Sequence, residues 1–333
     1  MNATPTLPSL IERFFIVRLM RQRRVSPNTV ASYRDTFRLL LAFARKHLGK
    51  APSSLDLIDI DAPLVGAFLD DLETHRSTSV RTRNLRLTAI RSFFQFVAYE
   101  EPAYSAHIQR VLAVPSKRHD KGMVQFLVQQ EIETLLAAPD RSTWIGRRDH
   151  ALLLLAVQTG LRLSELINLD VSSVVFGKGA YVRCVGKGRK ERCTPITRHV
   201  SAVLQAWLAE LPREDGNALF PTIHGGRLSA DAVQYAVAKY VTVARPHCPS
   251  LTHKRVTPHV LRHTAAMELL QAGVDPSVIA LWLGHESVQS TQVYLHAHMA
   301  IKESALAKLS PTGAARITRF RPGDRLLQFL DAL

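Results

Sequence analysis

The stretch LGHESVQSTQVYLH, from Leu283 to His296, places a histidine and a tyrosine nine positions apart, at His285 and Tyr294. An α-helix completes a turn about every 3.6 residues, so nine steps would put the two side chains on opposite faces. Gly284 offers a break, because glycine adopts the left-handed conformation that ends helices, and Ser287 is suited to cap a new helix. The stretch therefore predicts a bend after Gly284 that lets the imidazole and the phenol converge.

The charge of the whole chain favours a polyanionic partner. Its 333 residues include 43 Lys and Arg against 28 Asp and Glu, which gives a formal net charge of +15, and 46% are hydrophobic. This composition predicts a globular protein of about two domains that binds nucleic acid, with charge that serves only solubility as the alternative. No apolar run approaches the roughly 20 residues of a membrane span. Three unpaired cysteines and an N-terminus without a signal-peptide layout indicate a reducing cytoplasm.

The first hundred residues show helical periodicity almost throughout. We expect a helix in SLIERFFIVRLMRQRR, a second from Ser26-Pro27 to about His47, and a third from Asp61 to near Glu73. A fourth covers STSVRTRNLRLTAIRSFFQFVAYEE. Its expected core face comprises Leu85, Ile90, Phe93, Phe94 and Phe96.

Basic residues in this fourth helix and after it form a candidate DNA surface. The helix has almost no acids between Ser77 and Tyr99, which favours contact with phosphates over a merely solvated face. The next segment, VLAVPSKRHDKG, has no clear periodicity and predicts a linker over residues 111–124. The candidate phosphate contacts are Arg81, Arg83, Arg86 and Arg91 of the helix and Lys117, Arg118 and Lys121 of the linker.

The second half of the chain is mainly helical with one β-hairpin. Helical patterns occupy QEIETLLAAP and TWIGRRDHALLLLAVQTG, and the strand-like YVRCV and ERCTPI flank a basic turn, GKGRK. Further helices are expected to start near Thr197, Leu228, Pro258, Asp275 and Ser287. The predicted fold is thus mainly α with a small β-hairpin or sheet. Its domains are 1–110 and 125–310, followed by a tail at 311–333.

Four stretches carry residues suited to binding and cleaving a phosphodiester. In TGLRLSEL, Arg162 opens a helix where Glu165 can hold it, although a surface ion pair is the alternative. GKGRKER presents Lys187 between glycines, and TPHVLRH presents His259 and Arg262 on one helical face, with a packing role for His259 as its alternative. The opening stretch adds His285 and Tyr294. Cationic donors and a phenol nucleophile suit phosphoryl transfer without metal or ATP, and the sequence has no HExxH, CxxC or Walker motif.

In their order and form these motifs resemble the tyrosine recombinase (phage integrase) family. The resemblance implies a SAM-like N-terminal core-binding domain and an α+β catalytic domain that clamp DNA between them. It implies that Arg162, Arg262 and His285 bind the scissile phosphate and that Tyr294 is the nucleophile. Lys187 is then the general acid to the 5′ oxygen, and His259 an acid–base helper.

The resemblance also implies partners and leaves the biological role open. The partners would be double-stranded recombination sites, a homotetramer on paired sites and related recombinases, in the cytoplasm with the nucleoid, with no cofactor. A tail longer than in compact dimer-resolving recombinases favours an integrase or transposase of a mobile element, with the tail docking on a neighbouring protomer. Resolution of chromosome or plasmid dimers, a type IB topoisomerase and a non-catalytic DNA-binding protein are the alternatives.

Overall fold

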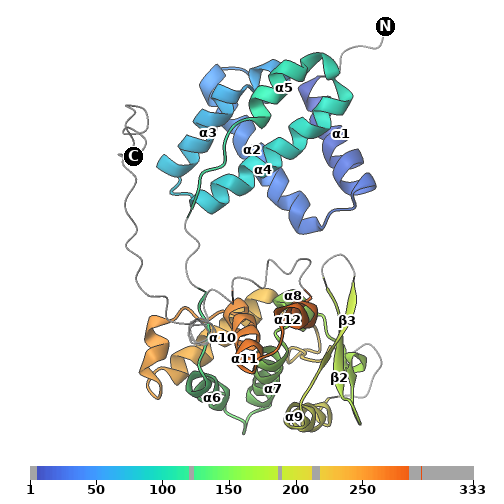
Figure 1. Ribbon diagram of the computed structural model, residues 1–333, viewed down its shortest axis with the longest axis vertical. Helices are drawn as coiled ribbons and strands as arrows, with labels where there is room; N and C mark the ends of the chain where they lie inside the picture. The colour runs from blue at the N-terminus through green and yellow to red at the C-terminus, as the bar shows by residue number, and fades with distance from the viewer. Residues whose placement is uncertain (1–5, 120–123, 187–189, 212–217, 285–293, 295–333) are drawn as a thin grey trace, which may run out of the picture. The chain divides into compact units, whose positions relative to one another are not determined.

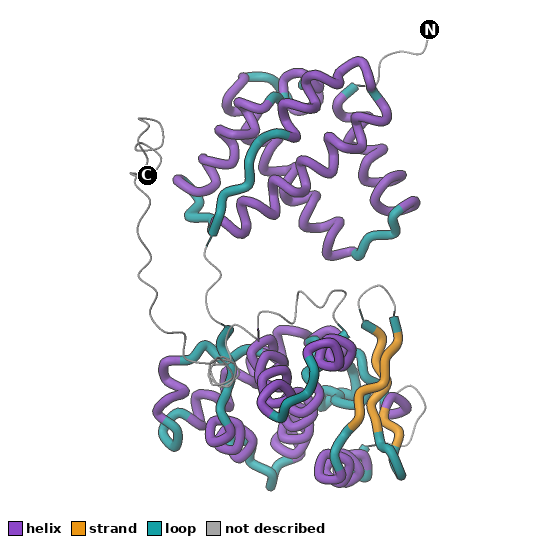
Figure 2. Tube along the Cα trace, viewed as in Figure 1, coloured by secondary structure: helices purple, strands orange, loops and turns teal. Residues whose placement is uncertain are grey.

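The computed structural model describes residues 6–119, 124–186, 190–211, 218–284 and 294. The chain divides into two compact units, unit 1 (Met1–Gly122) and unit 2 (Met123–Leu333), shown in Figure 1. Figure 2 shows that the described strands are confined to unit 2 and that helices and loops make up the rest. The prediction of a mainly helical protein with a small sheet is confirmed.

Unit 1 is a bundle of helices around an aromatic core. Its main helices are α1 (Leu7–Arg13), continued by the π-helix η1 (Phe14–Gln22), α2 (Pro27–Leu48), α3 (Ala62–Thr74), α4 (Val80–Glu100) and α5 (Ser105–Leu112). Short 3-10 turns lie at Pro52–Ser54, Leu57–Asp59 and Pro102–Tyr104. The rings of Phe37 and Phe93 meet edge to face at 5.3 Å, and Phe14 lies 5.5 Å from Phe93. Burying such a ring contributes roughly 1.5–3 kcal/mol.

Two predicted helix starts of unit 1 are confirmed by their caps. The Ser26 side chain accepts from Thr29 N, and the Asp61 side chain accepts from Leu64 N. The prediction that Leu85 belongs to the core face of α4 is wrong. Leu85 is 58% exposed, whereas Ile90, Phe93, Phe94 and Phe96 are buried. Leu85 lies outside the apolar face of α4 that packs against the other helices. Helical periodicity alone did not show where that face ends.

Unit 2 has helices on one side and a three-stranded antiparallel sheet on the other (Figure 1). The helices are α6 (Gln129–Ala137), α7 (Trp144–Thr159), α8 (Leu163–Ile167), α9 (Arg198–Leu208), α10 (Ala230–Ala244), α11 (Pro258–Gln271) and α12 (Pro276–Leu283). Short 3-10 turns occupy Val171–Ser173 and Pro249–His253. The strands are β1 (Val174–Val175), β2 (Tyr181–Val185) and β3 (Glu191–Pro195), in that order.

The centre of unit 2 is α7, whose ALLLLAV stretch is buried on all sides. Leu153 and Leu155 are fully buried, and α11 and α9 both contact the helix. The helix ends at Gly160, whose φ of +63° is the left-handed conformation that glycine adopts at least cost. This end starts the short loop that carries Arg162 into α8. The buried helix therefore fixes the place of the first candidate arginine.

Candidate active site

The break predicted in the opening stretch lies at Gly284. Helix α12 ends at Leu283, and Gly284 has φ +64° in the left-handed region. A Cβ at this position would lie 2.8 Å from Nη1 of Arg192, so both the backbone conformation and the space favour glycine. His285 lies outside the described residues, as does the predicted helix near Ser287. The convergence of His285 with Tyr294 stays a prediction.

Three arginines bind successive backbone carbonyls at the end of α12. The last carbonyls of a helix have no partner within it and carry the negative end of its dipole, so they attract cations. Each guanidinium comes from a different element: β3, α11 and the start of α8. The pairs are Arg192 Nε to Trp282 O at 3.1 Å, Arg262 Nη2 to Leu283 O at 2.7 Å, and Arg162 Nη2 to Gly284 O at 2.8 Å.

Arg162 is held by the carboxylate that the sequence predicted. Its backbone N–H donates to Oε2 of Glu165 at 2.7 Å and its Nη1 donates to Oε1 at 3.0 Å. Arg192 donates to both oxygens of the same carboxylate, at 2.8 and 2.7 Å. Burial acts to raise the pKa of Glu165, but the bonds and charges of the two arginines outweigh it and leave the pKa below its ordinary value. Glu165 is therefore an ionised, buried anchor for both guanidinium groups.

Arg262 is almost completely buried, with 3% of its surface exposed. Its Nη1 donates to Gly160 O at 2.6 Å, so the end of α7 and the end of α12 hold the same guanidinium. Burial lowers the pKa of Arg262 to about 10, and the nearby Arg162 charge acts in the same direction. A pKa of about 10 keeps this group cationic at neutral pH, beside the second cation that Arg162 provides.

Tyr294 lies buried in unit 2, with 2% of its surface exposed. It belongs to a buried apolar cluster with side chains of α11 and α12, among them Met267 and Leu283. Its hydroxyl lies 2.9 Å from Nδ1 of His263. Burial raises the pKa of the phenol, and the charges of Arg262 and Arg162 oppose that rise. The candidate nucleophile is thus protonated at neutral pH and lies within the field of both arginines.

Two residues of this arrangement were missed by sequence reasoning. His263 follows Arg262 in the HVLRH motif and lies one helical turn from His259, whose ring centroid is 4.3 Å away. That spacing of four was the available signal. Arg192 lies in the quoted GKGRKER stretch, but nothing local marks its pairing with Glu165, 27 positions earlier.

Lys187 lies outside the described residues, in the turn between the two strands of the hairpin. Strand β2 ends at Val185 and β3 begins at Glu191, with Val185 opposite Glu191 in the register. The predicted hairpin is confirmed. The position of the Lys187 ammonium relative to Arg162 and Arg262 stays a prediction.

The candidate DNA residues of unit 1 divide into exposed and buried groups. Arg81 is exposed and Arg86 half-buried, and burial lowers the pKa of Arg86. Arg83 is only 4% exposed; its Nη1 donates to Pro115 O, and its Nε lies 3.5 Å from Glu73. We therefore reassign Arg83 from a phosphate contact to a support for the segment after α5.

The start of the predicted linker is tied to unit 1 by side chains. Arg91 donates to Ser116 Oγ at 3.2 Å and to Val114 O, and Asn84 Nδ2 donates to Lys117 O at 2.8 Å. Lys117 Nζ also pairs with Glu73. Arg118 is exposed, and Lys121 lies outside the described residues. Arg91 thus holds the start of this segment, while Arg81, Arg86, Arg118 and the exposed Lys117 stay candidates for phosphate.

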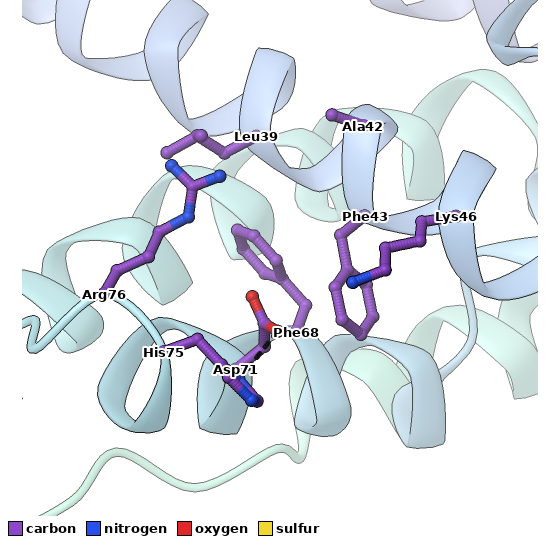
Figure 3. A pocket seen from close by; sticks show the side chains of 8 residues that line it. All are labelled: Leu39, Ala42, Phe43, Lys46, Phe68, Asp71, His75 and Arg76. Carbon is purple, nitrogen blue, oxygen red and sulfur yellow. Dashed lines mark ion pairs between the residues drawn. The ribbon is translucent and has the colours of Figure 1, made fainter.

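A cavity of about 460 Å³ in unit 1 is lined by charged and aromatic side chains but by none of the residues predicted to bind or cleave a phosphodiester (Figure 3). Figure 3 shows the rings of Phe43 and Phe68 between the side chains of Arg76 and Lys46. The described part of the chain holds no cluster of three potential metal ligands, and none of its helices is long and apolar enough to cross a membrane. The candidate active site is therefore the group of arginines, histidines and Tyr294 in unit 2.

Residues 125–300 match the phage integrase family, and residues 11–101 match its N-terminal SAM-like domain. The chain belongs to the phage integrase family. A relative named integrase/recombinase y4rC from Sinorhizobium fredii is 59% identical over 100% of both chains. The tyrosine recombinase XerC of Pelotomaculum thermopropionicum is 34% identical over 85% of this chain and 92% of its own.

The fold of this family member also agrees with solved structures. The XerH site-specific recombinase bound to palindromic difH substrate has a TM-score of 0.68 at 23% identity, over 85% of this chain and 80% of its own. Membership of the family makes this chain a tyrosine recombinase. The predicted tail helix over 311–333 lies outside the described residues.

We expect Arg192→Ala to destabilise unit 2 strongly. The substitution removes two bonds from the buried Glu165 carboxylate and one from the end of α12. Breaking a buried ion pair costs roughly 3–5 kcal/mol. All three tryptophans, at 144, 207 and 282, lie in unit 2, so tryptophan fluorescence during urea unfolding reports on this unit.

Arg227→Ala is the matched control. Its pair with Asp170 is partly exposed, and such a pair contributes roughly 0–1 kcal/mol. Equal losses of unfolding free energy in the two variants would contradict the assigned role of Arg192.

Proposed function

We propose that this recombinase cuts and rejoins DNA at specific sites through a covalent 3′-phosphotyrosine. The Tyr294 oxygen attacks the scissile phosphorus, and the bond to the 5′ oxygen breaks. Arg162 and Arg262, with His285, bind the non-bridging oxygens as negative charge develops on them. Lys187 gives a proton to the leaving 5′ oxygen, and His259 assists proton transfer. Because the phosphodiester energy stays in the protein–DNA bond, the reaction uses no ATP.

One observation carries this proposal. The buried phenol of Tyr294 is hydrogen-bonded at its hydroxyl and lies close enough to Arg262 and Arg162 for their charges to act on its pKa. A tyrosine with only a packing role does not require two guanidinium groups beside it. A phosphate bound between Arg162 and Arg262 would neutralise their positive charge. The experiment is incubation with DNA from the flanks of the protein's own gene, followed by recovery and sequencing of a covalent adduct.

We expect that adduct to form in the presence of EDTA and without nucleotide. Guanidinium and ammonium groups supply the positive charge that other phosphoryl-transfer sites obtain from a metal ion. The check is the yield of covalent protein–DNA complex on a denaturing gel, with and without chelator. A strict requirement of the cleavage step for Mg²⁺ would contradict this mechanism.

For the biological role we propose an integrase or transposase of a mobile element that assembles as a tetramer on paired sites. The integrase/recombinase name of the 59% identical relative supports it. Resolution of chromosome or plasmid dimers is the alternative, which the similarity to XerC favours. The test is recombination between two mapped sites. Recombination of two sites on one plasmid measures excision or resolution, and recombination of sites on two plasmids measures integration.

Two further readings make different predictions. A type IB topoisomerase would relax a plasmid that lacks any mapped site, whereas a recombinase needs paired sites. A non-catalytic DNA-binding protein would bind the mapped DNA without forming an adduct. The retention of Arg162, Lys187, Arg262 and Tyr294 in one chain supports the catalytic reading.

We expect the double variant Arg81→Ala with Arg86→Ala to bind DNA more weakly and with a flatter salt dependence. Each phosphate contact on duplex DNA contributes a slope of about −0.9 to the plot of log affinity against log salt, so two lost contacts reduce the slope by about 1.8. The measurement is fluorescence anisotropy over a series of salt concentrations. Arg83→Ala is the contrast, since its buried guanidinium should leave the slope unchanged. An unchanged slope in the double variant would show that these two arginines do not contact phosphate and lie on a solvated face of the helix.

A further inference from the structure

His263 connects the candidate nucleophile to the solvent side of α11. His259, Arg262 and His263 lie three and four positions apart, on one face of the helix. His259 is exposed, His263 is half-buried and Tyr294 is buried. The ring centroids are 4.3 Å apart between the two histidines and 5.4 Å apart between His263 and Tyr294.

Nucleophilic attack by a phenol requires that its proton be removed as the bond to phosphorus forms. Burial raises the pKa of Tyr294, so the hydroxyl does not lose its proton to water spontaneously at neutral pH. A group that takes the proton has to lie within hydrogen-bond reach of the phenol oxygen. Nδ1 of His263 meets this condition at 2.9 Å.

We propose that His263 is a catalytic residue that accepts the phenolic proton of Tyr294 during DNA cleavage. A neutral imidazole with its proton on Nε2 presents a lone pair at Nδ1. As the Oη–H bond breaks, an Nδ1–H bond forms, and the oxygen forms its bond to phosphorus while the P–O5′ bond breaks. The leaving 5′ oxygen takes its proton from a separate acid, which the proposed function assigns to Lys187. On rejoining, the His263 imidazolium returns its proton to Tyr294.

This inference rests on the proposed function, because it takes Tyr294 as the nucleophile. It differs in assigning proton removal to a residue that the family resemblance did not supply. His259 lies one helical turn earlier on α11, and its ring contacts the ring of His263. Its place suits support of the His263 ring, whereas His263 itself touches the reacting oxygen.

The test uses the full-length protein and a synthetic duplex copied from the mapped cleavage site. His263→Gln retains a polar side chain that cannot take the proton, and His263→Ala removes the contact. Both variants should form the adduct roughly 10²–10⁴-fold more slowly, the usual contribution of general acid–base catalysis. Their affinity for the duplex, measured by anisotropy, should stay near the wild-type value.

Two chemical substitutions separate proton removal from a structural role. A 5′-bridging phosphorothiolate in the duplex gives a leaving group that needs no acid, and it should leave the defect of His263→Gln unchanged. 3-Fluorotyrosine ionises more readily than tyrosine. With 3-fluorotyrosine at position 294, the difference in the rate of adduct formation between His263→Gln and the protein with His263 should shrink about tenfold or more. Tyr240→Phe, which also removes a buried tyrosine hydroxyl, controls for a loss of packing.

The outcomes are distinct. The assignment would be overturned if variants of His263 cleave within a few-fold of the wild-type rate. It would also be overturned if the phosphorothiolate duplex brings the cleavage rate of His263→Gln back to that of the wild type. If 3-fluorotyrosine leaves the rate defect of His263→Gln unchanged, His263 only supports the tyrosine ring, and its assignment as the proton acceptor is overturned. An adduct that persists in Tyr294→Phe would instead overturn the proposed function.

Discussion

Tyr294→Phe should abolish the covalent protein–DNA adduct while leaving DNA affinity near the wild-type value. The substitution removes the proposed nucleophilic oxygen and leaves Arg162 and Arg262 in place. Removal of a covalent nucleophile can lower turnover by about six orders of magnitude. The lost hydrogen bond to His263 should cost only about 1 kcal/mol of stability. The measurement is adduct yield on a denaturing gel beside anisotropy on the same duplex.

Tyr240→Phe is the matched control for this experiment. Tyr240 is a second buried tyrosine of unit 2, 3% exposed, whose hydroxyl donates to Oδ2 of Asp149 at 2.8 Å. Its loss removes a comparable bond at a distance from the candidate nucleophile, so adduct formation should continue. Undiminished adduct in Tyr294→Phe would transfer the nucleophile role to another residue.

The second large effect is expected for Arg262→Lys. Lysine keeps the positive charge, but one ammonium cannot reproduce the planar fork that bonds Gly160 O and Leu283 O. Misplacing or removing a donor to the transition-state oxygens lowers the rate by roughly 10²–10³-fold. Single-turnover cleavage of the mapped duplex measures the loss, and tryptophan fluorescence confirms that unit 2 remains folded.

Arg148→Lys separates this catalytic effect from the general cost of altering a buried arginine. Arg148 is 8% exposed and bonds Asp149 and the carbonyl of Pro221. Both lysine variants should lose stability, and only Arg262→Lys should lose cleavage rate at saturating DNA. Equal rate losses would assign Arg262 a purely structural role.

The sequence by itself located several helix ends in both units, although it predicted a linker from residue 111, where α5 runs to Leu112. A cap joins residues within three or four positions of one another, so its signal is complete in a short stretch of sequence. Local sequence therefore located the boundaries that flank Arg162, Arg262 and the break at Gly284. The confirmed boundaries are the caps at Ser26 and Asp61, the helix starts at Pro258 and Asp275, and the break at Gly284.

Only the tertiary structure decided which polar side chains are buried and what they contact. Arg83 reads as a surface cation in sequence, yet Glu73 and the backbone of Pro115 enclose it. The partners that place the site lie far apart along the chain: 90 positions separate Arg192 from Trp282, and 31 separate His263 from Tyr294. Contacts over such separations depend on how whole helices pack, and periodicity within one element carries no information about them. The sequence determined which chemical groups are available, and the packing of α8, α11 and α12 with β3 determined which of them meet.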